Sequence, residues 1–138
     1  MKQAHTRLFS LILMGTSIAV ATPALAADPY PTQPITLVVP YSAGGGTDII
    51  ARHLSDRLSK VFKQPVIVEN KPGANGIIGT RSVATSKPDG YTYALVVNSH
   101  LINPLVTKDI PYDTFKDFIG VTMVARSPLA FLSSSTLD

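Results

Sequence analysis

Residues 35–54 have the sequence ITLVVPYSAGGGTDIIARHL, which contains the pattern of a strand, a loop and a helix in succession. Residues 35–39 are apolar and mostly β-branched, which predicts a short buried strand. Pro40 ends this strand, and residues 41–46 form a glycine-rich loop. From Thr47 onward apolar residues recur at spacings near 3.6, which predicts an amphipathic helix. This order is typical of an α/β protein.

The predicted helix has two contrasting faces. We expect its apolar face to pack on the strand and to contain Ile49, Ile50, Leu54, Leu58, Val61 and Phe62. The opposite face is expected to be solvated and to contain Arg52, Asp56, Arg57 and Lys60.

The same pattern recurs further along the chain. Residues 65–69 predict a second strand, residues 70–76 a second turn-rich loop and residues 77–85 a short helix. Residues 92–97 predict a third strand, followed by a third loop over residues 98–104. Strands that alternate with helices in this way predict a parallel sheet with right-handed crossovers.

The rest of the chain is less regular. We expect residues 110–118 to be irregular or to carry a short helix, and residues 119–125 and 129–132 are later apolar segments. A doubly wound domain usually needs further elements to cover both faces of its sheet. Because the sequence stops at Asp138, just after an apolar run, we expect it to be the front part of a longer protein.

Two glycine loops are the main candidates for a binding site. In open α/β sheets, ligands bind at the edge formed by the carboxyl ends of the strands. Backbone N–H groups of glycine loops, followed by a helix N-terminus, can hold an anion such as a carboxylate or phosphate. The candidate ligand-binding residues of these loops are Tyr41, Ser42, Ala43, Gly44, Gly45, Gly46, Thr47 and Asp48, and Gly73, Ala74, Asn75 and Gly76. Each loop could equally be a tight turn without a ligand.

Three further side chains have alternative roles. Asp48 could pair with a cationic ligand group, but stabilisation of the helix start is the favoured role. Ser99 and His100 follow the third strand, where they could contact a ligand or could be satisfied by backbone groups.

Several classes of function are disfavoured. The chain has no cysteine and three histidines, so no cofactor or metal site is expected. The phosphate motifs G-x-x-x-x-G-K-[ST] and G-x-G-x-x-G are absent, and no nucleophilic elbow or carboxylate pair is evident. We therefore expect a binding protein rather than an enzyme.

The N-terminus has the pattern of an export signal. Lys2, His5 and Arg7 precede an apolar run over residues 8–21, and Ala24 and Ala26 complete a small-residue cleavage motif. The run is too short to cross a bilayer, which takes roughly 20 residues. We expect cleavage after Ala26, which leaves 10 basic and 9 acidic residues and gives no indication of nucleic-acid binding. The periplasm is the expected location.

Several motifs resemble one known family. They are YPTQPITLVVPY (residues 30–41), AGGGTD (43–48), QPVIVENKPGANG (64–76), KPDGYT (87–92), IPYD (110–113) and the segment 115–125. In this order and spacing they resemble the Bug family, the TctC-type solute-binding receptors of tripartite tricarboxylate transporters. The resemblance covers essentially the whole chain after the signal.

The resemblance implies a fold and a function. The fold would be a type II periplasmic-binding-protein fold of two α/β lobes, with residues 27–125 in the first lobe and 126–138 at the start of the crossover to the second. The two glycine loops would hold one carboxylate end of a small di- or tricarboxylate. The receptor, expected to be a monomer outside the membrane, would deliver this ligand to permease subunits. The family chain is about twice as long as this one.

Other functions stay open at the level of sequence. A receptor of this type could feed a signalling system, or the chain could be the non-functional remnant of a truncated gene. An enzyme acting on an anionic substrate is the least favoured alternative, because no acid, base or nucleophile can be assembled.

Overall fold

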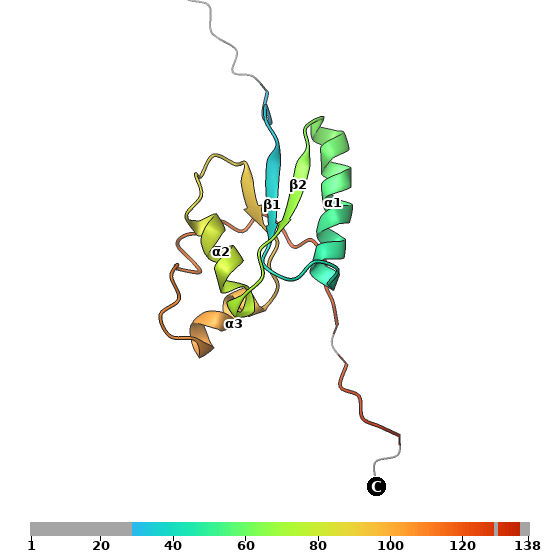
Figure 1. Ribbon diagram of the computed structural model, residues 1–138, viewed down its shortest axis with the longest axis vertical. Helices are drawn as coiled ribbons and strands as arrows, with labels where there is room; N and C mark the ends of the chain where they lie inside the picture. The colour runs from blue at the N-terminus through green and yellow to red at the C-terminus, as the bar shows by residue number, and fades with distance from the viewer. Residues whose placement is uncertain (1–28, 129, 136–138) are drawn as a thin grey trace, which may run out of the picture.

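The structure, a computed structural model, describes residues 29–128 and 130–135. The predicted signal peptide, residues 1–26, lies outside the described residues. The element order is β1 (Ile35–Val39), α1 (Gly46–Phe62), β2 (Val66–Asn70), η1 (Ala74–Gly76), α2 (Ile77–Ala84), β3 (Thr92–Ala94) and α3 (Ser99–Val106) (Figure 1).

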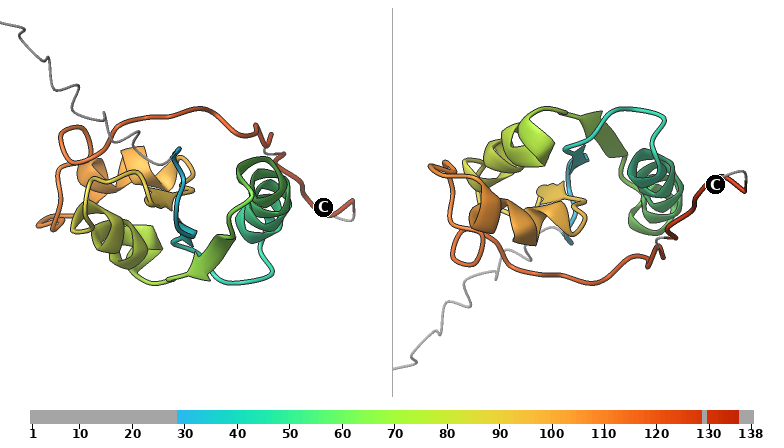
Figure 2. Two further views of the ribbon diagram at one scale, coloured as in Figure 1. Left: turned by 90° about the horizontal axis from the view of Figure 1, so that it is seen from above. Right: turned by 90° about the horizontal axis from the view of Figure 1, so that it is seen from below.

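The three strands form one parallel sheet in the order β2-β1-β3. Ile35 pairs with Val66 and Thr36 pairs with Thr92, so β1 lies between the other two strands. Figure 2 shows α1 on one side of β1 and α2 with α3 on the other. The parallel α/β sheet predicted from the alternating pattern is therefore confirmed.

The core is centred on β1, as expected of the middle strand of a sheet covered on both faces. The buried apolar residues of the core are Ile35, Leu37, Val38, Val39, Ala51 and Val66. Partly buried residues pack around this group, including Leu54, Leu58 and Phe62 of α1 and Tyr91, Tyr93 and Leu95 near β3.

The buried face of α1 differs from the predicted one. Ile49, Ile50 and Val61 are exposed, whereas Ala51 and Ser55 are buried. Small residues let the helix approach the sheet closely, and the Ser55 hydroxyl donates a hydrogen bond to the Val66 carbonyl. We predicted that all six apolar residues of the helix share its buried face, and this was wrong for Ile49, Ile50 and Val61. Apolar spacing alone did not distinguish the buried face of the helix from its exposed face.

Two predictions for the third unit need correction. β3 has three residues instead of six, although the Leu95 amide still donates to the Val38 carbonyl. α3 covers Ser99–Val106, including Pro104, where residues 98–104 were predicted as a loop. Pro104 removes one helical donor, but the Thr107 amide bonds to the Asn103 carbonyl at 2.8 Å and completes the last turn.

The segment after α3 has no long helix or strand among its described residues. At residues 113–117 the Asp117 amide bonds to the Asp113 carbonyl, which makes a single helical turn. Residues 119–128 then cross toward the side of α1 and continue away from the sheet. Phe115, Ile119 and Val121 are exposed along this path.

Candidate functional site

The first glycine loop lies between the end of β1 and the start of α1. Residues 42–46 are exposed, and Gly44 has a positive φ of 81°. Gly45 precedes the helix in an extended conformation, with φ −75° and ψ 166°, and no side chain caps it. The loop therefore exposes backbone rather than side chains, as an anion site built from amides requires.

Asp48 holds this loop in place. Its carboxylate is buried and accepts hydrogen bonds from the Gly44 amide at 2.9 Å, the Arg52 guanidinium at 2.9 Å and the Asn70 side-chain amide at 3.0 Å. Arg52 also donates to Asn70 at 3.2 Å, and the Asn70 amide donates to the Tyr41 carbonyl at 3.2 Å. The carboxylate thus ties the loop to α1 and to the end of β2.

These contacts change the pKa of Asp48. The hydrogen bond from Arg52, then the Gly44 amide and the Asn70 side chain, lowers the pKa from 3.8 to about 2. The Arg52 pKa is raised in turn by the hydrogen bond to Asp48. Asp48 is therefore charged at neutral pH, and both its oxygens face donors of this chain.

The network determines which loop amides face outward. The Gly44 amide donates to Asp48, and the Gly45 amide points to the Ser42 carbonyl at 3.4 Å. The first amides of a helix have no intrahelical acceptor. Among the described hydrogen bonds, the amides of Ser42, Ala43, Gly46 and Thr47 have no acceptor, so they are the donors of the loop left for a ligand.

The second glycine loop has an unusual backbone. All four residues have positive φ: Gly73 at 132°, Ala74 at 46°, Asn75 at 52° and Gly76 at 90°. The Asn75 side chain donates to Oδ1 of Asn103 at 2.8 Å, and Nδ2 of Asn103 donates to the Asn75 carbonyl at 3.1 Å. Asn103 is only 1% exposed, whereas Asn75 is exposed, so the pair joins a buried side chain to the surface of the loop.

Tyr41 joins the three loops. Its hydroxyl bonds to the Ser99 hydroxyl at 2.8 Å and accepts a hydrogen bond from the Val97 amide at 3.3 Å. Its ring lies 3.3 Å from the place where a Cβ on Gly76 would be. The three loops therefore meet around one side chain, as their position at the carboxyl edge of the sheet predicts.

His100 makes a different set of contacts. Its ring stacks on Tyr112, with centroids 6.0 Å apart, and meets Phe118 edge-on at 5.1 Å. Burial lowers the His100 pKa below 6.5. Its Nδ1 is buried without a hydrogen-bond partner among the described residues. His100 thus packs with the segment that follows α3, whereas Ser99, its neighbour in sequence, contacts Tyr41.

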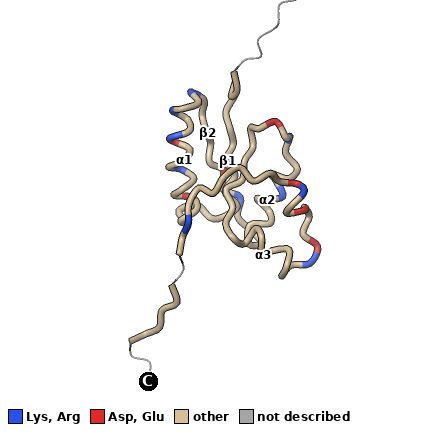
Figure 3. The backbone as a smooth tube through the Cα atoms, turned by 180° about the vertical axis from the view of Figure 1, so that it is seen from behind, with Lys and Arg blue, Asp and Glu red and all other residues tan. Residues whose placement is uncertain are grey.

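Asp48 and Lys71 are the charged residues of the two loops, and both are paired within the chain, Asp48 with Arg52 at 2.9 Å and Lys71 with Glu69 at 3.1 Å. Charged residues gather instead along α1 and in the segment 108–117 (Figure 3). Attraction of an anion to the loops would therefore depend on backbone amides and helix N-termini.

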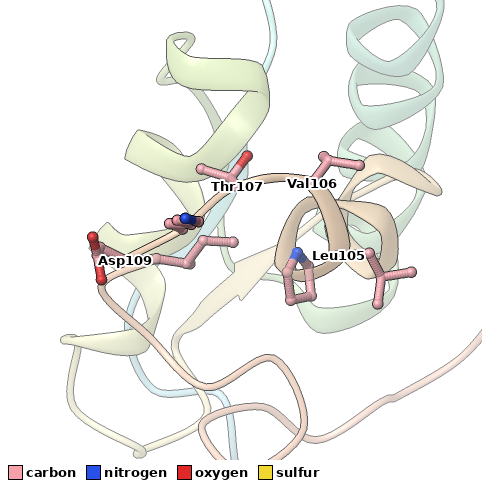
Figure 4. A pocket seen from close by; sticks show the side chains of 7 residues that line it. Leu105, Val106, Thr107 and Asp109 are labelled. Atoms are coloured by element: carbon pink, nitrogen blue, oxygen red, sulfur yellow. The ribbon is translucent and has the colours of Figure 1, made fainter.

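Two hollows on the described surface lie away from the loops. One is at the end of α3 and is lined by residues 104–110, including Leu105, Val106, Thr107 and Asp109 (Figure 4). The other is lined by residues of α1 and β2. Neither hollow is lined by a residue of the two loops, and residues 42–46 of the first loop are exposed. No group of three or more histidine or acidic residues among the described residues could hold a metal ion, and none of the described helices is long and apolar enough to cross a membrane.

Sequence reasoning missed Arg52, Asn70 and Asn103 as parts of the site. Arg52 was expected on a solvated face, and Asn70 was placed only at the start of a loop. Asn103 lies four residues after Ser99 and therefore on the same face of α3. This spacing would have indicated Asn103 if residues 99–106 had been predicted as a helix.

Comparison with known proteins identifies the family. The model of the tripartite tricarboxylate transporter family receptor (TctC) matches residues 50–137. A UPF0065 protein of Bordetella bronchiseptica is 47% identical over 122 residues, which are 88% of this chain and 36% of that protein. The protein BugT of Bordetella pertussis is 37% identical over 134 residues, which are 96% of this chain and 41% of that protein. This chain belongs to the TctC receptor family.

Solved structures agree with this assignment. The periplasmic binding protein BugD is 40% identical with a TM-score of 0.62, covering 64% of this chain and 30% of that one. MatC of Rhodopseudomonas palustris with bound malate has 33% identity, a TM-score of 0.61 and coverages of 64% and 31%. Rpa4515 of R. palustris with adipate has 38% identity, a TM-score of 0.60 and coverages of 62% and 29%. The chain thus spans well under half of its curated relatives and about 30% of these structures.

Proposed function

We propose that residues 41–48 and 73–76 form one wall of the binding site of a periplasmic receptor for a small carboxylate. The observation that carries this proposal is the meeting of two amide-bearing loops around Tyr41 in a member of the TctC family. Backbone amides and helix starts without unpaired charged side chains suit a carboxylate, because they supply donors and a favourable dipole. The malate and adipate complexes of MatC and Rpa4515 support this chemical class.

The proposal includes the setting in which the receptor works. Residues 1–26 act as an export signal that is removed after Ala26, residues 27–125 belong to the first lobe, and 126–138 begin the crossover. The lobes close on the ligand, and the permease of a tripartite transporter recognises the closed form. The loops described above hold one carboxylate, and the rest of the receptor determines which acid fits.

Gly45 allows a direct test of this function. A Cβ at Gly45 would meet only the Ser42 carbonyl, at 3.4 Å, and the backbone there is extended, so the fold accepts a larger residue. Gly45→Leu places a bulky side chain on the exposed loop and is expected to abolish carboxylate binding. Gly120→Leu is the matched control, because Gly120 is exposed and a Cβ added there would have no atom within 4 Å.

The measurement is calorimetric titration of the full-length, two-lobe receptor with malate, adipate and citrate, alongside thermal unfolding of each variant. Binding of a carboxylate by the wild type and by Gly120→Leu, with none by Gly45→Leu at unchanged stability, supports the proposal. Equal affinity in Gly45→Leu would contradict the role of the first loop. No binding of any carboxylate by the wild type would contradict the proposed function.

A further inference from the structure

The second loop includes one residue, Ala74, whose conformation its residue type does not favour. Four successive residues, 73–76, have φ between 46° and 132°. Glycine adopts such angles freely, and asparagine does so more readily than most residues, but alanine does not. Ala74 and Asn75 therefore need contacts from elsewhere in the fold to stay in this conformation.

Asn103 supplies such a contact to Asn75. Its Oδ1 accepts from the Asn75 side chain and its Nδ2 donates to the Asn75 carbonyl, so one amide group fixes both the side chain and the backbone of Asn75. Because Asn103 is 1% exposed, its amide group would be left buried without a partner if these bonds broke.

The position of Asn103 on α3 connects it to the first loop as well. Ser99 lies four residues earlier, on the same face of the helix, and bonds to Tyr41. α3 thus contacts the first loop through Ser99 and the second loop through Asn103. These two contacts fix the loops relative to each other.

We propose that Asn103 is a positioning residue that holds residues 73–76 in the left-handed conformation needed for ligand binding, with α3 as a two-point brace between the loops. This inference rests on the proposed carboxylate-binding function for its effect on affinity. Its structural part, the control of the loop backbone by Asn103, does not depend on any ligand.

The test uses the full-length, two-lobe receptor and two kinds of measurement. Asn103→Leu keeps a similar size and removes both hydrogen bonds. Titration with malate is expected to show binding about tenfold weaker or more, because the competent loop becomes a minor state and affinity falls with its population. Backbone amide resonances of residues 74–76, recorded without ligand, are expected to shift or broaden. Leu105→Ala, an 83% exposed position of the same helix, is the control and should change neither measurement.

A rescue variant distinguishes positioning from a general folding defect. Ala74→Gly removes the cost that alanine pays for its left-handed φ of 46° and leaves every backbone amide of the loop in place, so Asn103→Leu/Ala74→Gly should recover part of the affinity lost in Asn103→Leu. Recovery would not follow if Asn103→Leu merely weakened α3. If Asn103→Leu does not fold, Asn103→Asp serves instead, since it keeps the acceptor and turns an oxygen toward the Asn75 carbonyl.

The outcomes separate this inference from the proposed function. Unchanged amide resonances at 74–76 in the Asn103 variant would overturn the inference whatever the wild type binds. A double variant no better than the single one would also overturn it. A wild type that binds no carboxylate, together with resonances that shift in Asn103→Leu, would contradict the proposed function and leave the control of the loop by Asn103 supported.

Discussion

The two glycine loops occupy equivalent places in the fold but are held by different forces. The first loop is tied down by a buried carboxylate, Asp48, that takes hydrogen bonds from Gly44, Arg52 and Asn70. The second is held by a neutral pair, Asn75 and Asn103, and its backbone is left-handed. The first loop should therefore respond to pH and salt, and the second to substitutions that alter backbone preference.

Stability should be most sensitive to substitution where α2 packs against Pro40 and Lys71, at the starts of the two loops. A Cβ at Gly79 would lie 2.6 Å from the Lys71 carbonyl and 2.7 Å from Cβ of Pro40, at the base of both loops. Gly79→Ala is expected to lower the free energy of unfolding by about 2–3 kcal/mol, because the cost of overpacking against backbone exceeds the roughly 1 kcal/mol that alanine gains in a helix.

Chemical denaturation measures this effect. Gly120→Ala is the matched control, since nothing lies within 4 Å of its Cβ, and it should change stability by less than about 0.5 kcal/mol. Equal stability of Gly79→Ala and Gly120→Ala would mean that α2 does not press on the two loops as described.

The charged loop should have an acid dependence that the neutral loop lacks. The Asp48 pKa is about 2 in the folded state against 3.8 for the free group. A lowered pKa contributes stability above the unfolded value, and this contribution is lost as the pH falls from about 4 toward 2. Asp48→Asn should remove that part of the pH dependence, and it should also lower stability at pH 7, because the isosteric amide cannot accept all three donors.

The measurement is the free energy of unfolding as a function of pH for the wild type, Asp48→Asn and Asn75→Ala. Asn75→Ala removes the hydrogen bond from the Asn75 side chain to Oδ1 of Asn103 and should lower the whole curve without changing its slope between pH 4 and 2. A wild-type slope that survives in Asp48→Asn would assign the acid dependence to another carboxylate, such as Asp113, whose pKa is also lowered.

Much of the fold could be predicted from local sequence. β1, α1, β2 and α2 lie within one residue of their predicted bounds because apolar periodicity and glycine loops are local signals. The loops could be placed at one edge because parallel strands end on the same side. α3 was missed because Pro104 and Asn98 are typical of loops, and only packing on the loops explains a helix there.

The supporting contacts of the site could not be predicted. The contacts of Asp48 and Arg52 in α1 with Asn70 in β2 depend on how the helix packs on the sheet. Asn103 is 28 residues from its partner Asn75. The sequence shows these residue types but not their distances. The contacts of the candidate ligand-binding residues, such as Tyr41 with Ser99, are equally tertiary.

The smallest expected effect concerns Ala74 in the second loop. Its φ of 46° costs an alanine roughly 1–2 kcal/mol, which glycine avoids, while glycine loses about 0.5–1 kcal/mol through its freer unfolded chain. Ala74→Gly is therefore expected to raise the free energy of unfolding by about 0.5 kcal/mol. Ala84→Gly, at the right-handed end of α2, should lower it by about the same amount. Denaturant titration of the two variants beside the wild type measures both changes, and a loss of stability in both would mean that the second loop does not strain its backbone at Ala74.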